Sequence, residues 1–299
     1  MKRATFTTKI DINLAPKLKN DLVEKGFSLT NPAYTIFSAK KKGITLVLYK
    51  SGSLVVQGKE KDEFIEFYLE PEILKTFSYT NPEAFVSMTS RIGVDEAGKG
   101  DFFGPLSVAG LYADEKGIKK LISLNIRDSK KISDKSILDI ADMLKANFQI
   151  ATVRIFPEKY NDLYLKFKNL NHLLAWAHTS VISQLVEKTS CKNVIIDQFA
   201  NKSVVESAVR RKSLSINLEQ RTKAEEDPIV AGASIIARAA FLKGLEELSA
   251  EYNQKLPKGA SSFVIDIGRK FVETHGPEAL EKVAKIHFKT KDVILNGDS

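Results

Sequence analysis

The sequence predicts an α/β protein in which a mixed sheet flanked by helices is preceded by a small α+β domain. Beyond residue 91, short runs of β-branched residues alternate with longer stretches of helical periodicity, as in a sheet covered by helices. Residues 34–57 instead hold three strand-like runs separated by turns. A polar stretch that contains Asn81 and Pro82 separates the two patterns. We therefore expect a domain over residues 1–75, a linker over 76–90 and a larger domain over 91–299.

The composition narrows the class of protein before any motif is considered. Hydrophobic residues make up 43% of the 299 residues and charged residues 27%, values typical of a folded globular chain. The net charge of +8 suits a polyanionic partner without identifying one. The single cysteine, Cys191, cannot form an internal disulfide, no secretory signal is visible, and no segment has the roughly 20 apolar residues of a membrane span. We expect a cytoplasmic protein without a membrane partner, and a monomer as the simplest state.

The first domain is expected to be a helix, three antiparallel strands and a second helix. Apolar residues recur at helical spacing over residues 15–24, and Gly26 is placed to end that helix. Residues 60–75 have the pattern of an amphipathic helix, which Pro71 should kink or break. Aromatic and β-branched runs between glycine-containing turns predict strands over residues 34–39, 44–49 and 54–57. The sheet should keep one face free for a ligand.

The second domain is expected to begin with a hairpin, residues 92–94 and 106–112, whose loop contains the most distinctive motif of the chain. Further strands are predicted near residues 149–155, 194–196 and 214–217. Helices are predicted over residues 133–147, 169–187, 203–211 and 228–252, with two more starting near Val264 and Pro277. This alternation predicts a mixed sheet with helices on its faces.

Two adjacent carboxylates, Asp95 and Glu96, precede the turn Gly98-Lys99-Gly100 in the hairpin loop. Adjacent strand residues point to opposite faces, so both acids reach one centre only if the strand ends or bends there, which the glycines permit. Carboxylates hold hard divalent cations, and a glycine backbone lets a phosphate or sugar approach its N–H groups. The motif predicts metal-assisted chemistry on a nucleic acid; the alternative is a pair of solvated acids at a turn.

Two further acidic sites lie at the ends of predicted elements. Asp197 directly follows an apolar strand, so it either joins a site at the carboxyl end of the sheet or caps the helix that starts near Asn201. Glu225, Glu226 and Asp227 precede a long helix, whose N-terminus anions also stabilise. Together these acids predict a site for a pair of Mg²⁺ ions. Surface or packing roles are expected for the histidines, which share no ligand spacing: His172, His178, His275 and His287.

The run VDEAGKGDFFGP, from Val94 to Pro105, resembles the opening motif of type 2 ribonucleases H, and specifically of ribonuclease HIII, in which GKG takes the place of the GRG of ribonuclease HII. Residues 51–59, SGSLVVQGK, resemble the strand-turn-strand of half a TATA-binding-protein domain, an extension that ribonuclease HIII carries and ribonuclease HII generally lacks. The resemblance implies a ribonuclease H-like fold preceded by a TATA-binding-protein-like domain that binds substrate. Further segments follow in the family's order: DSKKIS at 128–133, NLNH at 169–172, IIDQF at 195–199, TKAE at 222–225 and ASIIAR at 233–238.

The resemblance also implies a role for each matching residue. Asp95, Glu96 and Asp197 are implied to be catalytic acids that bind metal, with Glu225 as the fourth. Because the segment after Glu225 is slightly shorter than the family pattern, Glu226 and Asp227 remain alternatives for the fourth position. Substrate contacts are expected from Gly98, Lys99, Gly100, Ser129, Lys130, Lys131, Asn169 and Asn171, and from Lys40, Lys42 and Lys50 of the first domain.

The implied reaction is endonucleolytic hydrolysis of the RNA strand of an RNA/DNA hybrid, which leaves 5′-phosphate and 3′-hydroxyl ends and uses two ions of Mg²⁺ or Mn²⁺. Discrimination of RNA from DNA depends on the 2′-hydroxyl, which the Gly98-Lys99-Gly100 main chain can approach closely. One alternative is a ribonuclease HII-like enzyme that cuts at single embedded ribonucleotides. Another is a non-catalytic nucleic-acid-binding protein.

Overall fold

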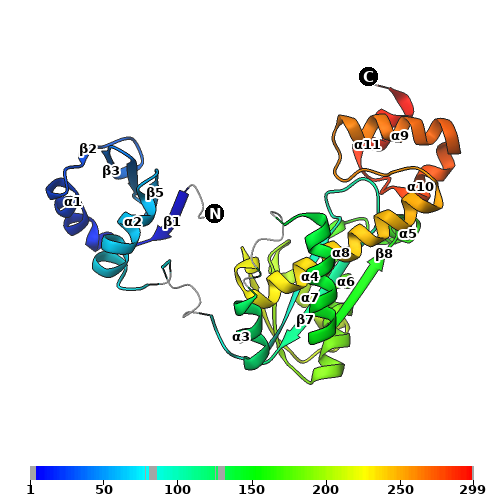
Figure 1. Ribbon diagram of the computed structural model, residues 1–299, viewed down its shortest axis with the longest axis horizontal. Coiled ribbons are helices and arrows are strands. Elements are labelled where there is room, and N and C mark those ends of the chain that lie inside the picture. Colours follow the sequence, from blue (N-terminus) through cyan, green and yellow to red (C-terminus); the bar gives the residue numbers. More distant parts are fainter. Residues whose placement is uncertain (1–4, 78, 81–85, 125, 127–131, 298–299) are drawn as a thin grey trace. The chain divides into compact units, whose positions relative to one another are not determined.

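The protein consists of two compact units, Met1–Ser87 and Met88–Ser299, each with its own hydrophobic core (Figure 1). The computed structural model describes residues 5–77, 79–80, 86–124, 126 and 132–297. The expected linker over residues 76–90 lies partly outside the described residues, so its limits stay a prediction.

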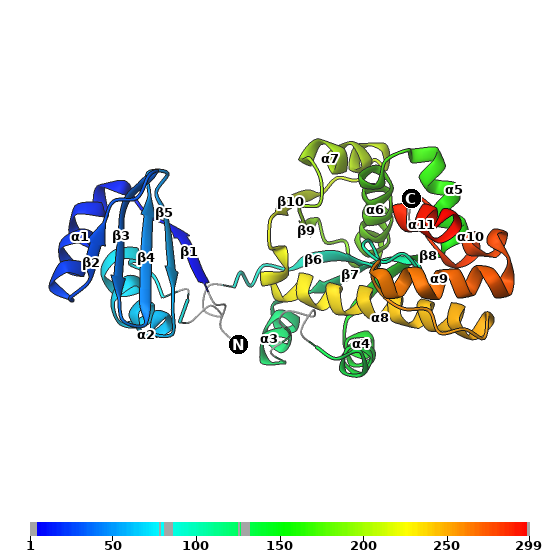
Figure 2. The same cartoon turned by 90° about the horizontal axis from the view of Figure 1, so that it is seen from above.

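The N-terminal unit is a five-stranded antiparallel sheet whose strands pair in the order β1-β5-β4-β3-β2 (Figure 2). The three predicted strands are confirmed as β3, β4 and β5. The sequence does not predict the edge strands β1 and β2, because β1 is mostly polar and β2 has only three residues. The strands span Thr5–Lys9 (β1), Ser28–Thr30 (β2), Thr35–Lys41 (β3), Ile44–Tyr49 (β4) and Ser53–Gln57 (β5).

The helices of this unit differ from the sequence-based expectation at Pro71. The predicted first helix is confirmed as α1 (Ala15–Glu24), which follows the short turn η1 (Ile12–Leu14). The second helix, α2 (Lys61–Phe64), continues into η2 (Ile65–Leu74), a π-helix that includes Pro71. Of the expected kink or break, the break does not occur: the helix continues through Pro71 with the wider turns of a π-helix, which accommodate a residue that has no backbone N–H to donate.

The sheet of this unit is covered by its helices on one face. Alternate residues of the central strands, among them Phe37, Leu46 and Leu54, are fully buried in one cluster with residues of α1 and η2. Their neighbours along the strands, such as Ser38 and Val47, are only partly buried. The unit therefore has the free sheet face that the sequence predicts.

Glu70 hydrogen-bonds the segment that follows η2 to the N-terminal unit. Its fully buried side chain accepts hydrogen bonds from the backbone N–H of Thr80 (3.1 Å), from that of Tyr79, and from the Thr80 hydroxyl. A buried carboxylate without donors would be strongly destabilising, so these bonds fix Tyr79 and Thr80. The hydrogen bonding of this unit thus extends past residue 75.

The larger unit is built on a five-stranded mixed sheet in the order β10-β9-β6-β7-β8. β6 pairs antiparallel with β7 and parallel with β9, which confirms the predicted hairpin and the mixed sheet. The last strand begins later than predicted: the apolar residues Leu214 and Ile216 pack against the core but precede the paired strand. The strands span Arg91–Ala97 (β6), Leu106–Ala113 (β7), Gln149–Ile155 (β8), Asn193–Asp197 (β9) and Asn217–Arg221 (β10).

Helices pack on both faces of this sheet (Figures 1 and 2). The predicted helices are confirmed as α4, α6, α7, α8 and α9, and the last expected start falls at the short turn η6 (Pro277–Ala279). The helices α3, α5 and α11 are not predicted from the sequence, and the structure adds them. The helices span Glu115–Ser123 (α3), Asp134–Asn147 (α4), Pro157–Phe167 (α5), Leu170–Thr189 (α6), Lys202–Arg211 (α7), Pro228–Glu251 (α8), Ser262–His275 (α9), Leu280–Val283 (α10) and Lys289–Asn296 (α11).

Two glycines let α8 and α6 approach opposite faces of β6 and β7. A Cβ on Gly93 would lie 2.7 Å from the backbone nitrogen of Val230 in α8. One on Gly110 would lie 2.7 Å from the side chains of Val181 and Leu185 in α6. Within the described part of the chain, α8 alone is long and apolar enough to suit a membrane span, contrary to the sequence-based expectation. However, 72% of that stretch is buried inside the unit, as in a core helix.

The C-terminal helices anchor the loop that follows the GKG turn. Phe102 and Phe103 are fully buried in a cluster with residues of α8, α9 and α10. Buried Lys285 donates from Nζ to the backbone carbonyls of Asp101 (2.7 Å) and Gly104 (2.6 Å), and from its backbone N–H to the carbonyl of Phe102 (2.9 Å). These bonds attach the loop firmly to the C-terminal region.

We expect the stability of the protein to depend on pH through Lys285. Burial lowers the pKa of Lys285 to about 7 from an ordinary value of 10.5. Below pH 7 the amine is charged in both the folded and the unfolded chain, so folding bears the full penalty of burying the charge. Between these two pKa values the unfolded chain binds more protons, so the free energy of unfolding should rise with pH, by at most about 1.4 kcal/mol per unit.

The reference protein for this measurement is the variant Lys285→Met, which has no titratable amine at position 285. The free energy of unfolding in urea, measured for both proteins between about pH 6 and pH 9, gives the difference as a function of pH. We expect the wild type to gain stability relative to the variant as the pH rises. A difference that stays constant would contradict the buried, depressed lysine.

Candidate active site

Asp95 and Asp197 lie side by side at the ends of two paired strands. β6 and β9 run parallel with Val94 opposite Ile196, and the next residues in that register are Asp95 and Asp197. Residues in register on neighbouring strands point to the same face of a sheet. The two carboxylates that the sequence places 102 positions apart (197 − 95) are therefore neighbours.

Both carboxylates lie on the side of the sheet that α8 covers. The hydroxyl of Ser234, on α8, hydrogen-bonds Asp95, and the Ala224 N–H donates to Asp197 (3.0 Å). The alternative role of Asp197 as a helix cap is not realised, because Asn201 itself caps α7. Asp197 is thus available to a site at the carboxyl end of the sheet.

Glu96 points to the other side of the sheet, towards α6. Its Oε2 lies 3.0 Å from Nε2 of His178 in α6, and its Oε1 lies 3.6 Å from Nζ of Lys99. The alternation of side chains along β6, which continues through Ala97, explains this placement. The bend that the sequence predicts comes after both acids, at Gly98, where φ is +86°.

Of the three acids before α8, Glu225 lines the same cavity as Asp95, Glu96 and Asp197, and Asp227 does not. Asp227 is buried, caps α8 by accepting from the Ile229 N–H (2.9 Å) and pairs with Arg91 (2.7 Å). Glu226 is exposed. The helix-capping alternative therefore describes Asp227, and Glu225 is the acid that the fold brings to the others.

The four expected acids line one cavity of about 290 Å³ at this edge of the sheet. β6 and β9 supply three of them, and the short turn η5 (Ala224–Glu226) before α8 supplies the fourth. The GKG turn forms the adjoining wall. The complete lining is Asp95, Glu96, Ala97, Gly98, Lys99, Gly100, Asp197, Glu225, Ala231 and Ser234.

The electrostatics of this cavity favour a bound cation. Burial raises the pKa of Asp95, and repulsion by the neighbouring charge of Glu96 raises it further. Burial acts in the same direction on the pKa of Glu96, but the hydrogen bond and charge of His178, followed by Lys99, outweigh it and lower that pKa. An all-oxygen donor set with unbalanced negative charge fits a hard divalent cation.

The carboxylates surround the cavity without converging on one point. Among the residues that the structure describes, no three side chains of His, Cys, Asp or Glu are grouped closely enough to hold an ion. Glu96 is directed towards α6, and Asp197 is bonded to the Ala224 N–H. Ion binding therefore requires Asp197 to turn into the cavity, whereas Glu96 keeps its Oε1 on the side of the GKG turn, 3.6 Å from Nζ of Lys99.

The two glycines of the GKG turn have different structural roles. Gly98 has a positive φ, and a Cβ there would lie 2.2 Å from the carbonyl oxygen of Pro105. At Gly100 a Cβ would meet no atom within 4 Å, and the backbone is not in the left-handed region. The fold therefore requires glycine at position 98 but not at position 100.

The remaining expected contacts in the larger unit lie elsewhere or are not described. Asn169 caps α6 by accepting from the N–H of Asn171 (2.8 Å), and neither residue lines the cavity. The expectation for Ser129, Lys130 and Lys131 falls outside the described residues.

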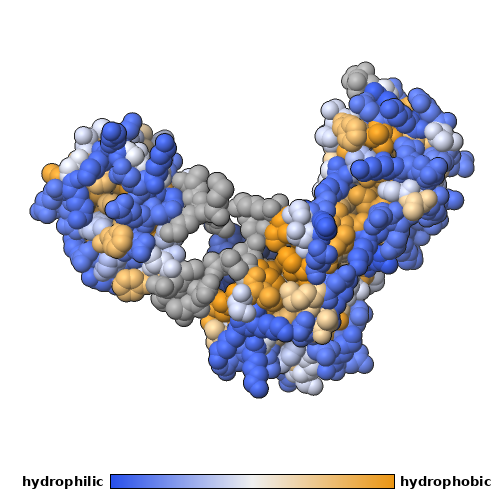
Figure 3. Space-filling view, in the orientation of Figure 1, coloured by the Kyte–Doolittle hydropathy of each residue, from blue (hydrophilic) through white to orange (hydrophobic). Residues whose placement is uncertain are grey.

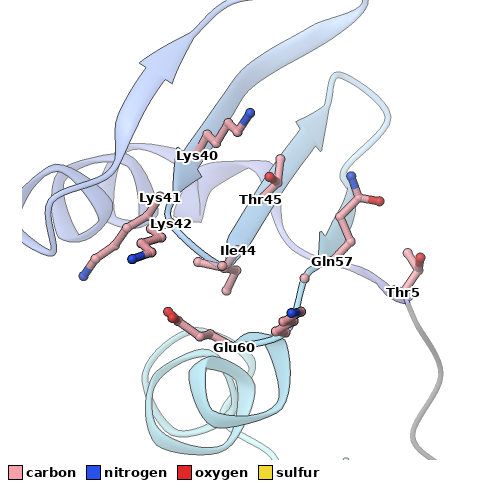
Figure 4. Close-up of a pocket in the computed structure, with 11 residues that line it drawn as sticks. Thr5, Lys40, Lys41, Lys42, Ile44, Thr45, Gln57 and Glu60 are labelled. Carbon is pink, nitrogen blue, oxygen red and sulfur yellow. The ribbon is translucent and has the colours of Figure 1, made fainter.

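In the N-terminal unit, the structure separates the three expected lysines. Lys40 and Lys42 line a cavity of about 720 Å³ beside the β3–β4 turn (Figure 4). Lys50 follows β4 at its other end and does not line this cavity. Lys40 and Lys42 therefore lie together, and Lys50 lies at the other end of β4.

Three residues of the site escape sequence reasoning: Ser234, His178 and Phe199. The expectation that His178 is a surface or packing residue is incomplete, because it also contacts Glu96. The Phe199 ring packs against His178, with centroids 4.7 Å apart, and lies 5.8 Å from Nζ of Lys99. For His178, the sequence does contain a signal: a histidine lies inside the largely apolar stretch LLAWAHTSVI of α6.

A mixed sheet in this order, with carboxylates at the ends of β6 and β9 beside a glycine-rich turn, defines a hydrolase of the ribonuclease H-like class. A family model for ribonuclease HII matches residues 92–291, and one for a domain of unknown function (DUF3378) matches residues 6–81. The chain belongs to the ribonuclease HII family, in its ribonuclease HIII branch.

Relatives of known name support this assignment over nearly the whole chain. The ribonuclease HIII of Protochlamydia amoebophila is 52% identical over 290 residues, 97% of this chain and 96% of the relative. That of Chlamydia caviae is 47% identical over 297 residues, 98% of each chain.

Solved structures support the same assignment. The crystal structure of Bst-RNase HIII in complex with Mn²⁺ has a TM-score of 0.68 and 27% identity, covering 97% of this chain and 98% of that one. The crystal structure of Aquifex aeolicus RNase H3 has a TM-score of 0.57 and 31% identity, covering 94% and 99%. The protein is therefore an endoribonuclease of the ribonuclease H class that acts on nucleic acid.

Substitution of Glu225 and Asp227 should separate their roles. Glu225→Gln, in a partly exposed turn, should change the free energy of unfolding by no more than about 0.5 kcal/mol and strongly reduce cleavage. Asp227→Asn leaves buried Arg91 without its charge partner and should lower the free energy of unfolding by about 3 kcal/mol. Urea unfolding and cleavage assays measure both effects. Full activity of Glu225→Gln would exclude Glu225 as the fourth acid.

Proposed function

We propose that the protein hydrolyses the RNA strand of RNA/DNA hybrids, leaving 5′-phosphate and 3′-hydroxyl ends, with two divalent ions of Mg²⁺ or Mn²⁺. The observation that carries the proposal is the cavity in which Asp95, Glu96, Asp197 and Glu225 meet beside the Gly98-Lys99-Gly100 turn. A homologue has been crystallised with Mn²⁺, which agrees with the use of a divalent metal.

Each acid has a proposed role that follows from its place. Asp95 and Asp197, adjacent on one face, would be the main metal ligands, and Glu96 and Glu225 would complete the sites from either side. The ions, when bound, would supply the charge that activates water and stabilises the leaving oxygen. Ser234 and His178 hold Asp95 and Glu96 in orientation through hydrogen bonds.

Selection for RNA is assigned to the main chain of the GKG turn. The 2′-hydroxyl is the group that distinguishes RNA from DNA at every nucleotide, and it can both donate and accept a hydrogen bond. Gly100 supports this assignment, because its surroundings are open and the fold itself does not need glycine there. Lys99, with its amine next to the cavity, would add a phosphate contact.

The N-terminal unit is assigned a second contact with the hybrid, on its free sheet face. The register aligns Lys40, Thr45, Gln57 and Thr5 in one polar row across four strands. Figure 4 shows these residues around the cavity, with Lys41 and Lys42 extending from the β3–β4 turn. Hydrophilic residues also predominate on the surface of this unit in the orientation of Figure 3, which does not view the sheet face-on. Polar and basic side chains in such a row suit the phosphate backbone.

Asp95→Asn is the direct test of the proposed chemistry. With Mg²⁺ present, the variant should lose cleavage of a labelled RNA/DNA hybrid and still bind it, because the amide cannot replace a metal-binding carboxylate. Binding is measured by fluorescence anisotropy with a labelled hybrid. Equal cleavage by variant and wild type would exclude this site and favour the non-catalytic alternative.

The substrate panel in the same assay separates the two enzymatic alternatives. It compares a uniform hybrid with DNA duplexes that contain one ribonucleotide, in Mg²⁺ and in Mn²⁺. The wild type should prefer the uniform hybrid. Preferential cutting beside the single ribonucleotide would support the ribonuclease HII-like alternative.

A matched pair of glycine substitutions tests the role of the turn. Gly100→Ala should leave the melting temperature unchanged and weaken binding of the hybrid about tenfold or more, equivalent to about 1.4 kcal/mol, because the methyl group obstructs close approach of the sugar. Gly98→Ala should lower the melting temperature, since the clash with Pro105 distorts the loop itself. Normal hybrid binding by Gly100→Ala would contradict the main-chain contact.

A further inference from the structure

We propose that His178 is a positioning residue that fixes the carboxylate of Glu96 for metal binding. The inference rests on the metal-dependent function proposed above. It concerns a residue outside the four acids, on the helix that covers the opposite face of the sheet from α8.

The contact between the two side chains is buried and specific. His178 is 0% exposed, and its Nε2 lies 3.0 Å from Oε2 of Glu96. This hydrogen bond uses one oxygen of the carboxylate and leaves Oε1 on the side of the GKG turn, where Lys99 lies 3.6 Å away. The Lys99 side chain is 38% exposed, so solvent weakens its ion pair with Glu96, and the orientation of Glu96 depends chiefly on buried His178.

A purely packing role does not explain a histidine at this position. The Nδ1 of His178 is buried and has no hydrogen-bond partner among the described residues. Apart from Thr179, whose hydroxyl bonds the Ala175 carbonyl of the same helix, the other buried positions of α6 are apolar, among them Leu174, Ala177 and Val181. An apolar side chain at position 178 would avoid burying an unpaired nitrogen. The bond to Glu96 is therefore the interaction that accounts for the imidazole.

The ring is also held in orientation from the strand that carries Asp197. Phe199 follows Asp197 by two residues and packs against the His178 ring at a centroid distance of 4.7 Å. His178 thus links Glu96 to the segment after β9 through one hydrogen bond and one ring contact. Carboxylates that ligate metals are commonly fixed by such outer hydrogen bonds, and their loss weakens metal affinity by about 10- to 100-fold.

Two amide substitutions test the reach of this hydrogen bond. In His178→Gln the amide N–H₂ can reach Glu96, whereas in His178→Asn, one methylene shorter, it cannot. The binding of Mn²⁺ to the full-length protein, without nucleic acid, is measured from the electron paramagnetic resonance signal of the free ion. We expect near wild-type affinity for the Gln variant and about tenfold or greater weakening for the Asn variant. His172→Asn, on the exposed start of the same helix, is the control and should bind Mn²⁺ like the wild type.

A second variant keeps the test valid if His178→Asn does not fold. His178→Phe retains a ring of similar volume against Phe199 and removes the donor, and it should weaken Mn²⁺ binding to the same extent. The effect of either substitution should vanish in a Glu96→Gln background, which a merely structural role would not produce.

The outcomes distinguish this inference from the proposed function. Mn²⁺ uptake by Asp95→Asn equal to that of the wild type would overturn the metal site itself. If Asp95→Asn loses Mn²⁺ binding but the folded Asn or Phe variant at position 178 binds it like the wild type, or more tightly, the positioning role of His178 is wrong and the metal site stands.

Discussion

The larger unit depends on the packing of β6 between two helices, with no room for side chains at the points of contact. Gly93 lets the backbone of α8 approach one face, and Gly110 on the neighbouring strand lets α6 approach the other. Because both helices are fixed this closely, each delivers a polar side chain to the end of β6. Ser234 reaches Asp95 from α8, and His178 reaches Glu96 from α6. The site is therefore a product of sheet packing as much as of its own residues.

The electrostatic arrangement divides neighbouring acids into two kinds. Asp227 is buried but compensated, since Arg91 balances its charge and its second oxygen accepts a hydrogen bond from the Ile229 N–H at the N-terminus of α8. Asp95 is buried beside another carboxylate, and burial with this repulsion raises its pKa. The fold thus compensates Asp227 within the protein, whereas burial and the neighbouring Glu96 disfavour the charged form of Asp95. A cation bound in the cavity would relieve this repulsion.

The loop that carries the glycines is fixed at both ends, which suits a recognition element made of main chain. Gly98 turns sharply after β6, and the following Asp101–Gly104 segment is bonded to Lys285 and packed among the C-terminal helices. Rigid support of this kind keeps backbone N–H groups in place for a ligand. Gly100, between these anchors, has open space around it. The C-terminal helices thus contribute to the site without entering it.

The sequence by itself determines the mixed sheet and the long helices, because apolar periodicity is a local property of the chain, and its motifs make Asp95, Glu96 and Asp197 candidate site residues. It does not reveal the edge strands β1 and β2, whose pairing depends on partners distant in sequence. It favours Glu225 as the fourth acid but leaves Glu226 and Asp227 as alternatives. Only the tertiary structure separates them, since burial and the partner Arg91, 136 residues away, decide which acid is neutralised. His178 enters the site for the same reason: its partner becomes a neighbour only when α6 packs on the sheet.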